Sequence, residues 1–593
     1  MSGTRIALPV TILAALALVS CSMQQEAFEL AFESPSETTY TNSTVELAVA
    51  TADQPFERIE LVRGDTVIAE LVGSTTHTWD TSDVNEGSYE VTARAYRGDT
   101  VAEAGPVTVV VDRTAPSISD TTPANGDENV ATDGSISITF SEAIDPDSIS
   151  GDSLVLARDG GVNVAASRTV SQNGESVTMT ILGRPELPVE LVASASNTIR
   201  DRAGNQLESG TTWNWKVPGW LPVGGPAEIE SNHRSYGPSL AFDSAGTAYV
   251  AYYEHVDSDF RIYVSRWDGS AWAQVGGAVS TTTAGVDSYY PSLAIDNADR
   301  PVVAYEERWS SSDERIFVKR LESGSWSQLG SAVDSSQYAF RPDLAIDQNG
   351  LPVVAWVENN GSYDEVRVKR WTGTSFTGVG GALNIGADNA DEPDVEINSD
   401  HEITVAWEEY DGSDYNIYYA YWDPNADFGS GAWVPQPQDF TDNAEPLDRV
   451  QSNNVNAPSM TPVPEDDTPY VAWDEVGEIY VGRPWNYTYY EGDSILNVDP
   501  SRYADSVRTA LDSQGRLLVA WAESGLSGDD DLYVKRFENN FTLLGGAVYE
   551  GPYSGEEPSL ALAPDDRPYV AYEVYSKATQ SFDIRVVRYN GWE

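Results

Sequence analysis

Aromatic, glutamate and arginine side chains recur together through the second half of this 593-residue chain. An aromatic residue follows a Val-Ala pair seven times, and a Glu stands two residues later in each repeat except at Val574. Such a trio could bind a sugar, because an aromatic face stacks on the ring while carboxylate and guanidinium groups bond its hydroxyls. A trio required in almost every repeat is also typical of core packing, which we favour. The aromatics are Tyr252, Tyr305, Trp356, Trp407, Trp473, Trp521 and Tyr572; the glutamates are Glu254, Glu307, Glu358, Glu409, Glu475 and Glu523; the arginines, on the next strand, are Arg266, Arg320, Arg370, Arg483, Arg536 and Arg588.

Two sets of variable loops are a better place for a specific site. One set precedes each repeat, and the other joins its second and third expected strands, so in a four-stranded meander both sets emerge on the same face. Function is usually carried by loops that a rigid scaffold holds. We predict ligand contacts from four side chains near this face, and the alternative is that they are ordinary exposed loop residues. They are Tyr236, Tyr290, Phe340 and Arg341.

No catalytic motif is present. The four histidines, at 77, 233, 255 and 401, stand in no metal-binding spacing, and the chain has no Gly-x-Ser-x-Gly elbow and no P-loop. The Ser-x-Asp-x-Gly-x-x-Trp boxes of sialidases, which are also propellers, are missing. Acidic residues are so common in the loops that a paired-carboxylate glycosidase stays open, yet no pair can be chosen. The sequence therefore assigns no catalytic residue and no metal ligand, and it favours a binding protein over an enzyme.

The acidic balance limits the partners. Asp and Glu number 93 against 35 Lys and Arg, which gives a formal charge of -58. A polyanion of this size repels nucleic acid, whose affinity comes mostly from neutralised phosphates. We interpret most of the charge as a solvated coat and expect no cofactor. Ca²⁺ is possible at Asp145–Asp147 and Asp201, although such residues are more often turn caps.

A repeat of about 50 residues must position these groups. Its copies start at residues 238, 291, 342, 393, 458, 507 and 558, and each reads as four short strands. Four antiparallel strands per repeat predict the blade of a β-propeller, here over residues 218–593. The seventh repeat lacks its last strand, and "GWLPVGG", Gly219 to Gly225, supplies a matching one at the start. We therefore predict a closed ring of seven blades in which the first segment pairs with the last blade.

Two modules with a period-two pattern precede the repeats, at residues 27–112 and 113–217. Runs such as "TVELAVA" and "PVTVVVD" are typical of β-sandwich strands. "HTWDTSDVNEGSYEVTARAYRGD" followed by "DRTAP" resembles bacterial Ig-like domains of surface proteins. "PANGDENVATDGSISITFSEAIDPDSI" and "RDRAGN" resemble the Ig-like domains of bacterial S-layer proteins. The resemblance implies two Ig-like spacers, so the predicted fold class is all-β: two sandwiches followed by a seven-bladed propeller.

The N-terminus reads as an export signal. Residues 1–21 hold one Arg, a short apolar run and "LVSC", which resembles the bacterial lipobox and implies that Cys21, the only cysteine, carries lipid after cleavage. Residues 22–26 would then be a tether, and Ser22 after the Cys is typical of outer-membrane sorting. A plain signal peptide is the alternative.

These features predict an exported protein, lipid-anchored at the outer membrane or cell surface. Its Ig-like spacers would present a propeller that binds a glycan or a protein outside the cytoplasm, with the membrane contacted through the anchor alone. A glycan-cleaving enzyme and a structural envelope component are the alternatives.

Overall fold

The computed structural model describes residues 29–591, apart from 52–55, 133, 159–160, 183–186, 229–232, 337, 399, 426–430, 437–445, 448–454, 464–465, 484–495, 525–529, 539, 550–553 and 577–580. The predicted signal peptide, Cys21 and the tether lie outside the described residues. Within the described part, no helix is long and apolar enough to cross a membrane. The chain divides into two compact units, one of Met1–Asn125, Ser135–Gly183 and Val192–Asn214, and the other of Gly126–Gly134, Arg184–Leu191 and Trp215–Glu593.

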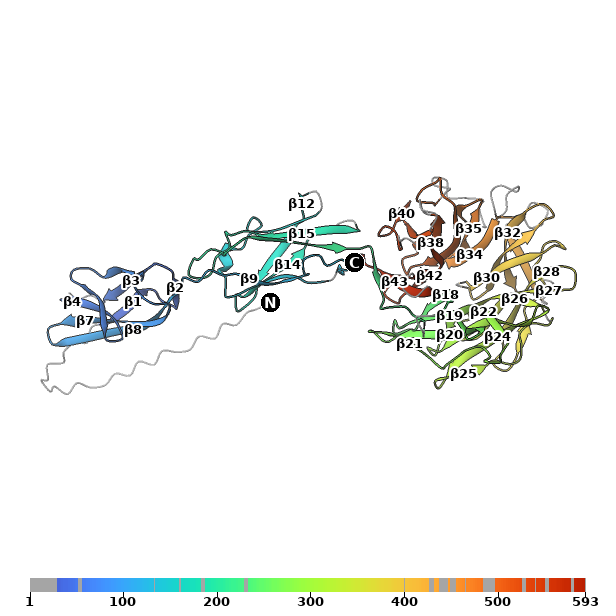
Figure 1. Ribbon diagram of the computed structural model, residues 1–593, viewed down its shortest axis with the longest axis horizontal. Helices are drawn as coiled ribbons and strands as arrows, with labels where there is room; N and C mark the ends of the chain where they lie inside the picture. Colours follow the sequence, from blue (N-terminus) through green and yellow to red (C-terminus); the bar gives the residue numbers. More distant parts are fainter. Residues whose placement is uncertain are drawn as a thin grey trace, which may run out of the picture. The chain divides into compact units, whose positions relative to one another are not determined.

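Residues 30–217 form two β-sandwiches (Figure 1). In the first, a sheet of order β1-β3-β6 faces one of order β2-β8-β7-β4-β5, around a core that includes Leu47, Ile59 and Trp79. In the second, the sheets have the orders β13-β14-β10-β9 and β12-β11-β15-β16. The alternation of buried and exposed residues in strands such as β10 explains why each sheet buries one face. The strands are β1 Leu30–Ser34, β2 Thr39–Thr41, β3 Thr44–Thr51, β4 Arg58–Arg63, β5 Thr66–Leu71, β6 Thr76–Asp80, β7 Gly87–Arg97, β8 Thr100–Val111, β9 Ile118–Thr122, β10 Ile136–Phe140, β11 Leu154–Arg158, β12 Val162–Asn163, β13 Ala166–Val170, β14 Ser176–Ile181, β15 Val189–Ala195 and β16 Thr211–Val217, with a 3₁₀ turn at Pro146–Ser148.

Residues 220–589 of the second unit form a seven-bladed β-propeller. Blades 1 to 4 and 6 each contain four antiparallel strands in chain order, and the described part of blade 5 contains three. Blade 1 is β18 Ser235–Phe242, β19 Ala248–Val256, β20 Asp259–Trp267 and β21 Trp272–Gln274; blade 2 is β22 Asp287–Ile295, β23 Pro301–Ser310, β24 Asp313–Glu322 and β25 Ser325–Gln328; blade 3 is β26 Ala339–Ile346, β27 Pro352–Asn359, β28 Asp364–Trp371 and β29 Phe376–Gly378; blade 4 is β30 Ala390–Ile397, β31 Ile403–Tyr410, β32 Tyr415–Asp423 and β33 Ala432–Gln436. Blade 5 is β34 Val455–Val463, β35 Asp466–Glu475 and β36 Glu478–Gly482; blade 6 is β37 Ala504–Leu511, β38 Leu517–Ser524, β39 Asp530–Phe537 and β40 Phe541–Leu543; blade 7 is β41 Gly555–Leu562, β42 Pro568–Ser576, β43 Ser581–Tyr589 and β17 Trp220–Pro222.

The turn between the first two strands of a blade forms as its sequence predicts. In blade 1 the Asp243 carboxylate accepts the N–H groups of Ala245 and Thr247 at 3.0 and 2.8 Å. Gly246 adopts a φ of +81°, which glycine reaches without strain. The second strand that follows is buried on both faces in most blades, so it reads as a nearly continuous apolar run.

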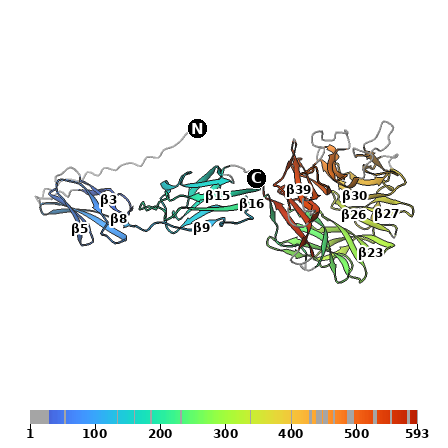
Figure 2. The ribbon, with the colours of Figure 1, turned by 45° about the horizontal axis from the view of Figure 1, so that its top comes forward.

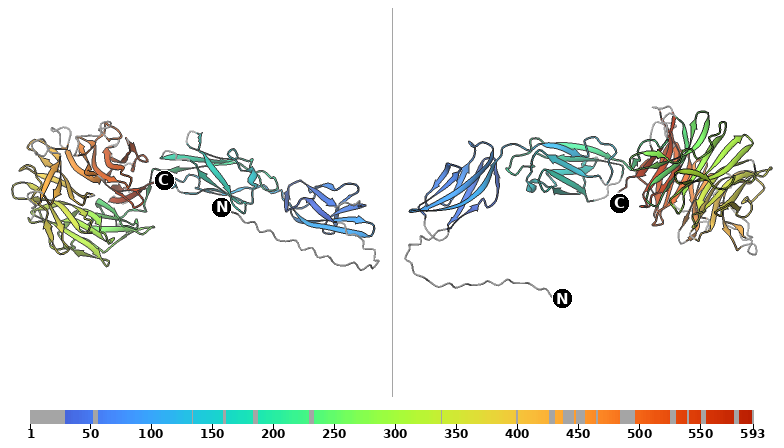
Figure 3. Two further views of the ribbon diagram at one scale, coloured as in Figure 1. Left: turned by 180° about the vertical axis from the view of Figure 1, so that it is seen from behind. Right: turned by 90° about the horizontal axis from the view of Figure 1, so that it is seen from below.

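The ring closes as predicted. Strand β17 pairs antiparallel with β43, with Trp220 opposite Tyr589 and Pro222 opposite Val587, and so becomes the outer strand of blade 7. Each blade's first strand contacts the first strand of the next blade, and β41 of blade 7 contacts β18 of blade 1. Figure 1 shows β18, β22, β26, β30 and β34 toward the middle of the ring and β21, β25 and β40 at its rim. Figures 2 and 3 show the red last blade returning beside the green first one.

Candidate functional site

A left-handed residue interrupts the first strand of every blade. Each of these strands has a bulge, and the residue within it has a φ between 42° and 56°. Non-glycine residues seldom adopt this conformation. Because the residue is not glycine in six of the seven blades, we attribute the conformation to the bulge in the fold rather than to the residue type. We call these seven residues the first row; they are Gly237, Tyr290, Arg341, Glu392, Ala457, Ser506 and Glu557.

The first strands enclose a cavity on the propeller axis. Its volume is about 190 Å³, and residues of all seven first strands line it, including Tyr290, Arg341 and Glu392 of the first row. Two positions after each first-row residue stands a second row, of which all members except Ser459 line the cavity. Its members are Ser239, Ser292, Asp343, Asp394, Ser459, Arg508 and Ser559.

Carboxylates and two arginines give the cavity its charge. The pKa values of Asp343 and Asp394 are raised because both groups lie deep in the fold, and Asp343 raises that of Asp394 further. Burial likewise raises the pKa of Glu396, two residues beyond Asp394 on β30, and the charges of Asp394 and Asp343 add to this. The Arg508 guanidinium opposes these shifts at Asp343 and Asp394. These acids therefore hold protons more readily than exposed carboxyl groups do.

Arg341 is the second arginine in the cavity lining. Its guanidinium forms ion pairs with Asp391, at 2.9 Å, and with Glu392. It also lies 6.0 Å from the centre of the Tyr290 ring, within range of a cation–π contact. Tyr290 itself is 46% exposed, so its ring is available to a ligand.

An aromatic cluster extends from Tyr290 across blades 2, 1 and 7. Tyr253 lies 6.3 Å from Tyr290, 5.4 Å from Tyr289 and 5.6 Å from Phe260 between ring centres. Tyr236 stacks on Tyr253 at 5.5 Å, and it lies 5.1 Å from Phe582 of blade 7. A side chain at Gly237 would meet the Tyr253 ring at 2.8 Å, so glycine in the first row leaves room for this cluster. Tyr290, the one aromatic residue in the lining of the described cavity, therefore joins the cavity to this cluster.

Four buried acids occupy the position that holds Tyr253 in blade 1. Burial is the main cause of their raised pKa values, which are about 7 for Glu306 and Asp474 and about 8 for Glu408 and Glu573. The Glu573 carboxylate accepts the N–H of Gly237 at 3.1 Å, and that of Glu408 accepts the N–H of Ala457 at 3.2 Å. Acids of one blade thus bind the first row of the next. Sequence reasoning missed them, although each directly follows a repeated aromatic residue.

The four predicted ligand residues have different surroundings. Tyr290 and Arg341 line the cavity and contact each other. Tyr236 is half-buried within the aromatic cluster. Phe340 is half-buried, packs 5.5 Å from Tyr338 and is not among the cavity-lining residues. Their binding of a ligand stays a prediction.

The repeated aromatic–Glu–Arg trio is structural. All seven aromatics and all six glutamates of the trio are buried. The Glu523 carboxylate accepts the Trp521 indole N–H at 3.0 Å and the N–H groups of Val498 and Asp499 at 2.7 and 2.8 Å. Arg370 pairs with the turn residue Asp347. In these blades the trio therefore ties strands to their connecting segments, as the packing interpretation predicted.

Glu523→Ala should lower the free energy of unfolding by about 3 kcal/mol, because three donors lose their acceptor. Glu538→Ala is the control, since its side chain is 50% exposed and its loss should change stability little. Urea unfolding of both variants measures the difference. Equal stability of the two would show that the trio does not hold the blade.

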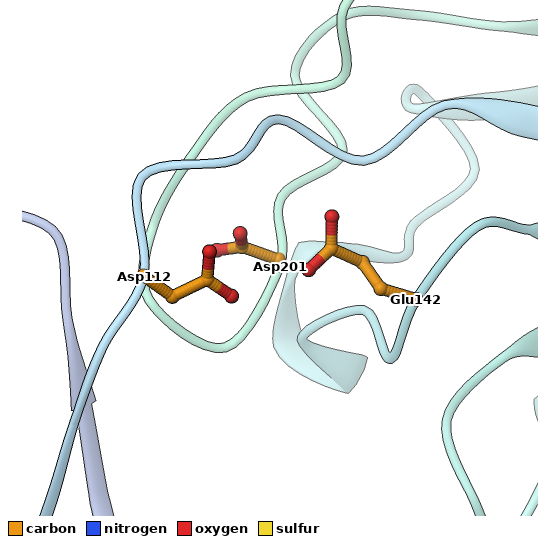
Figure 4. Close-up of side chains that lie close together, drawn as sticks. All are labelled: Asp112, Glu142 and Asp201. Carbon is orange, nitrogen blue, oxygen red and sulfur yellow. The ribbon is translucent and has the colours of Figure 1, made fainter. Parts of the chain in front are cut away.

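An acidic cluster lies in the first unit. Oxygens of Asp112, Glu142 and Asp201 lie within 4.8 Å of one another, and Figure 4 shows the three carboxylates turned toward a common point. Burial and the charges of Asp112 and Asp201 raise the pKa of Glu142 to about 7. Asp201 accepts the backbone and side-chain N–H groups of Asn205 at 2.9 and 2.7 Å, so it already acts as a loop cap. Asp145 caps the 3₁₀ turn through the N–H of Asp147. Ca²⁺ binding stays a prediction.

The comparisons with known proteins identify one module. Residues 112–217 match the model of a bacterial Ig-like domain. No curated protein matches the chain. Solved structures similar to it include a protein of unknown function from Dyadobacter fermentans, at 11% identity over 63% of this chain and 100% of that one, with a TM-score of 0.40. Polysaccharide lyase Uly1 is 10% identical over 60% of this chain and 90% of its own, with a TM-score of 0.38. A Penicillium chrysogenum alpha-L-arabinanase complexed with arabinobiose is 11% identical over 50% and 92%, with a TM-score of 0.34. At these TM-scores the likenesses carry no functional argument.

Proposed function

We propose that this chain is a cell-envelope protein whose propeller binds a glycan at the axial cavity. The observation that carries the proposal is that the cavity lining combines an exposed ring with charged groups. Tyr290 offers the ring, and the neighbouring Arg341 and Glu392 offer donors and acceptors. Sugars need both, since their C–H faces pack on rings and their hydroxyls need polar partners.

The proposal extends to the way in which the propeller is displayed. A lipid at Cys21 would hold the chain at the outer membrane or cell surface, and the two sandwiches would separate the propeller from the lipid. Stable anchoring takes more than one acyl chain. Asymmetry of the first row supports a single site rather than seven equivalent ones, because its seven side chains differ in size and charge.

A glycan array with the wild-type chain, followed by titration of the best ligand, tests the proposal. Tyr290→Ala should weaken binding at least about tenfold, because it removes the exposed ring. Leu543→Ala is the control: Leu543 is 40% exposed on β40, an outer strand, and its loss should leave the affinity unchanged. Equal affinity of Tyr290→Ala and the wild type would place the site elsewhere.

A second candidate is glycan cleavage, and Glu408 is the residue that favours it. Its pKa of about 8 keeps it protonated at neutral pH, partly because of the charges of Glu392 and Asp391 beside Arg341. A protonated carboxyl group beside further carboxyl groups is the arrangement of a general acid and its partner. Release of reducing ends from polysaccharides by the wild type, lost in Glu408→Gln, would establish this activity; binding without release would leave the lectin-like function.

A further inference from the structure

The second row forms a ring of hydrogen bonds between neighbouring blades. In six of the seven junctions, a Ser or Asp oxygen accepts a backbone N–H from the first strand of the next blade. The six acceptor–donor pairs are Ser239 with Leu293 at 2.9 Å, Ser292 with Leu344 at 3.1 Å, Asp343 with Val395 at 2.8 Å, Asp394 with Met460 at 3.0 Å, Ser459 with Thr509 at 3.0 Å and Ser559 with Leu240 at 2.9 Å. A short side chain with an acceptor oxygen thus links neighbouring blades at these six junctions.

The junction between blades 6 and 7 breaks this ring. Arg508 takes the second-row position in blade 6, and a guanidinium has no acceptor. The matching donor is the N–H of Leu560 on β41, which corresponds to Leu240 on β18, and among the described residues no hydrogen bond to it is found. The junction therefore presents a backbone donor and a guanidinium where every other junction presents a satisfied pair.

Arg508 is also free to bind an anion. Its one hydrogen bond within the described chain runs from Nη1 to the Val507 carbonyl at 2.7 Å, and it forms no ion pair with any described carboxylate. It nevertheless lines the same cavity as Asp343 and Asp394. Its charge reduces the rise that burial causes in the pKa values of these two carboxyl groups. The Asp343 and Asp394 oxygens already accept N–H groups of blades 4 and 5. Arg508 therefore has N–H donors without a partner among the described residues, in a cavity that also holds the Asp343 and Asp394 carboxyl groups.

We propose that the junction of blades 6 and 7 binds the carboxylate of an acidic sugar, held by the Arg508 guanidinium and the Leu560 N–H. The ligand oxygen would supply the missing acceptor and complete the ring. This inference rests on the proposed glycan function and names its ligand class: a glycan with a uronate-type residue.

The size and lining of the cavity favour a single sugar unit as the bearer of that carboxylate. About 190 Å³ is below the roughly 300–1,000 Å³ of pockets for larger ligands, so the cavity suits one monosaccharide unit. The second-row residues Ser239, Ser292, Asp343, Asp394 and Ser559 are within the same lining, and their oxygens can meet its hydroxyls. Guanidinium groups bind carboxylates through two parallel hydrogen bonds, which makes arginine selective for this group.

Titration of the full chain with sodium glucuronate, glucose and glucosamine tests the proposal. The wild type should bind glucuronate at least about tenfold more tightly than glucose, since hydrogen bonds to charged groups are the stronger kind. Sodium acetate should compete weakly for the same site, whereas sodium chloride at equal ionic strength should not.

Arg508→Ser is the decisive variant, because it places in blade 6 the residue that blades 1, 2, 5 and 7 already carry. It should complete the ring with its own oxygen, so its melting temperature should equal or exceed that of the wild type while the preference for glucuronate disappears. Arg508→Lys keeps the positive charge but lacks the planar guanidinium with its paired N–H donors, so it should retain part of the preference for glucuronate.

The outcomes separate this inference from the proposed function. Binding of neutral glycans without preference for glucuronate, or an unchanged preference in Arg508→Ser, overturns the acidic-sugar site and leaves the glycan function standing. Tighter binding of glucosamine than of glucuronate overturns it too, since the acids would then select the ligand. Absence of binding by any glycan overturns both.

Discussion

Deletion of Gly219–Gly225 should destabilise the propeller more than any other change considered for this chain. The segment contains β17, the outer strand of blade 7, and without it β43 becomes an open edge. The Trp220 indole N–H donates to the Leu544 carbonyl of blade 6 at 2.9 Å, and its ring lies 5.5 Å from Tyr589. Exposed strand edges pair with other chains. We expect a loss of monomer and aggregation on heating, measured by size-exclusion chromatography and calorimetry.

Trp220→Ala provides the graded version of this experiment. Truncation of a buried Trp should cost about 3–5 kcal/mol while the strand pairing stays possible. Leu543→Ala is the control, because Leu543 is 40% exposed on β40 and its loss should change stability little. A deletion protein that remains monomeric with an unchanged melting temperature would contradict closure of the ring by β17.

Raising the pH from 5 to 9 should destabilise the propeller. Glu306, Glu408, Asp474 and Glu573 have folded-state pKa values of about 7 to 8, against about 4 in an unfolded chain. Between these limits the folded state binds more protons than the unfolded state, so the free energy of unfolding falls as the pH rises. The stabilisation is complete below about pH 4 and is lost as the pH passes 7 to 8. We expect a decrease of several kcal/mol in the free energy of unfolding over this interval, measured by urea unfolding.

The double variant Glu408→Gln and Glu573→Gln should flatten that pH dependence. The amide oxygens can still accept the N–H groups of Ala457 and Gly237, while the two titrating groups are gone. Glu538→Gln, on an exposed side chain, should leave the slope unchanged. A wild-type chain whose stability rises from pH 5 to 9 would mean that these carboxyl groups are ionised in the fold.

The sequence predicted the blades well because their signal is local. A strand, an Asp-containing turn and a second apolar strand recur with nearly constant spacing, so hairpins such as β18–β19 follow from neighbouring residues. Closure was also predictable, because the seventh repeat lacks the strand that Gly219–Gly225 supplies. The second sandwich could be placed through its resemblance to bacterial Ig-like domains, and residues 112–217 match that family.

The site was less predictable because its contacts join different blades. The ring of Ser and Asp acceptors links residues 50 or more positions apart. The aligned repeats show Arg508 where the others carry Ser or Asp, but only the fold shows which backbone N–H that position binds. The left-handed first row is invisible for the same reason, since it depends on bulges in strand pairing. Tyr290 and Arg341 could be selected because they stand at the variable start of their repeats. The buried acids beside the aromatics could not, because only the fold turns them toward the next blade.

A crystal structure of the chain with the best array ligand bound tests the central claim most directly. We predict electron density for a sugar in the axial cavity, with its ring within van der Waals distance of Tyr290 and its polar groups bonded to residues of the first and second rows. A ligand bound to the outer strands of the blades or to the sandwiches, with the axial cavity unchanged, would contradict the account.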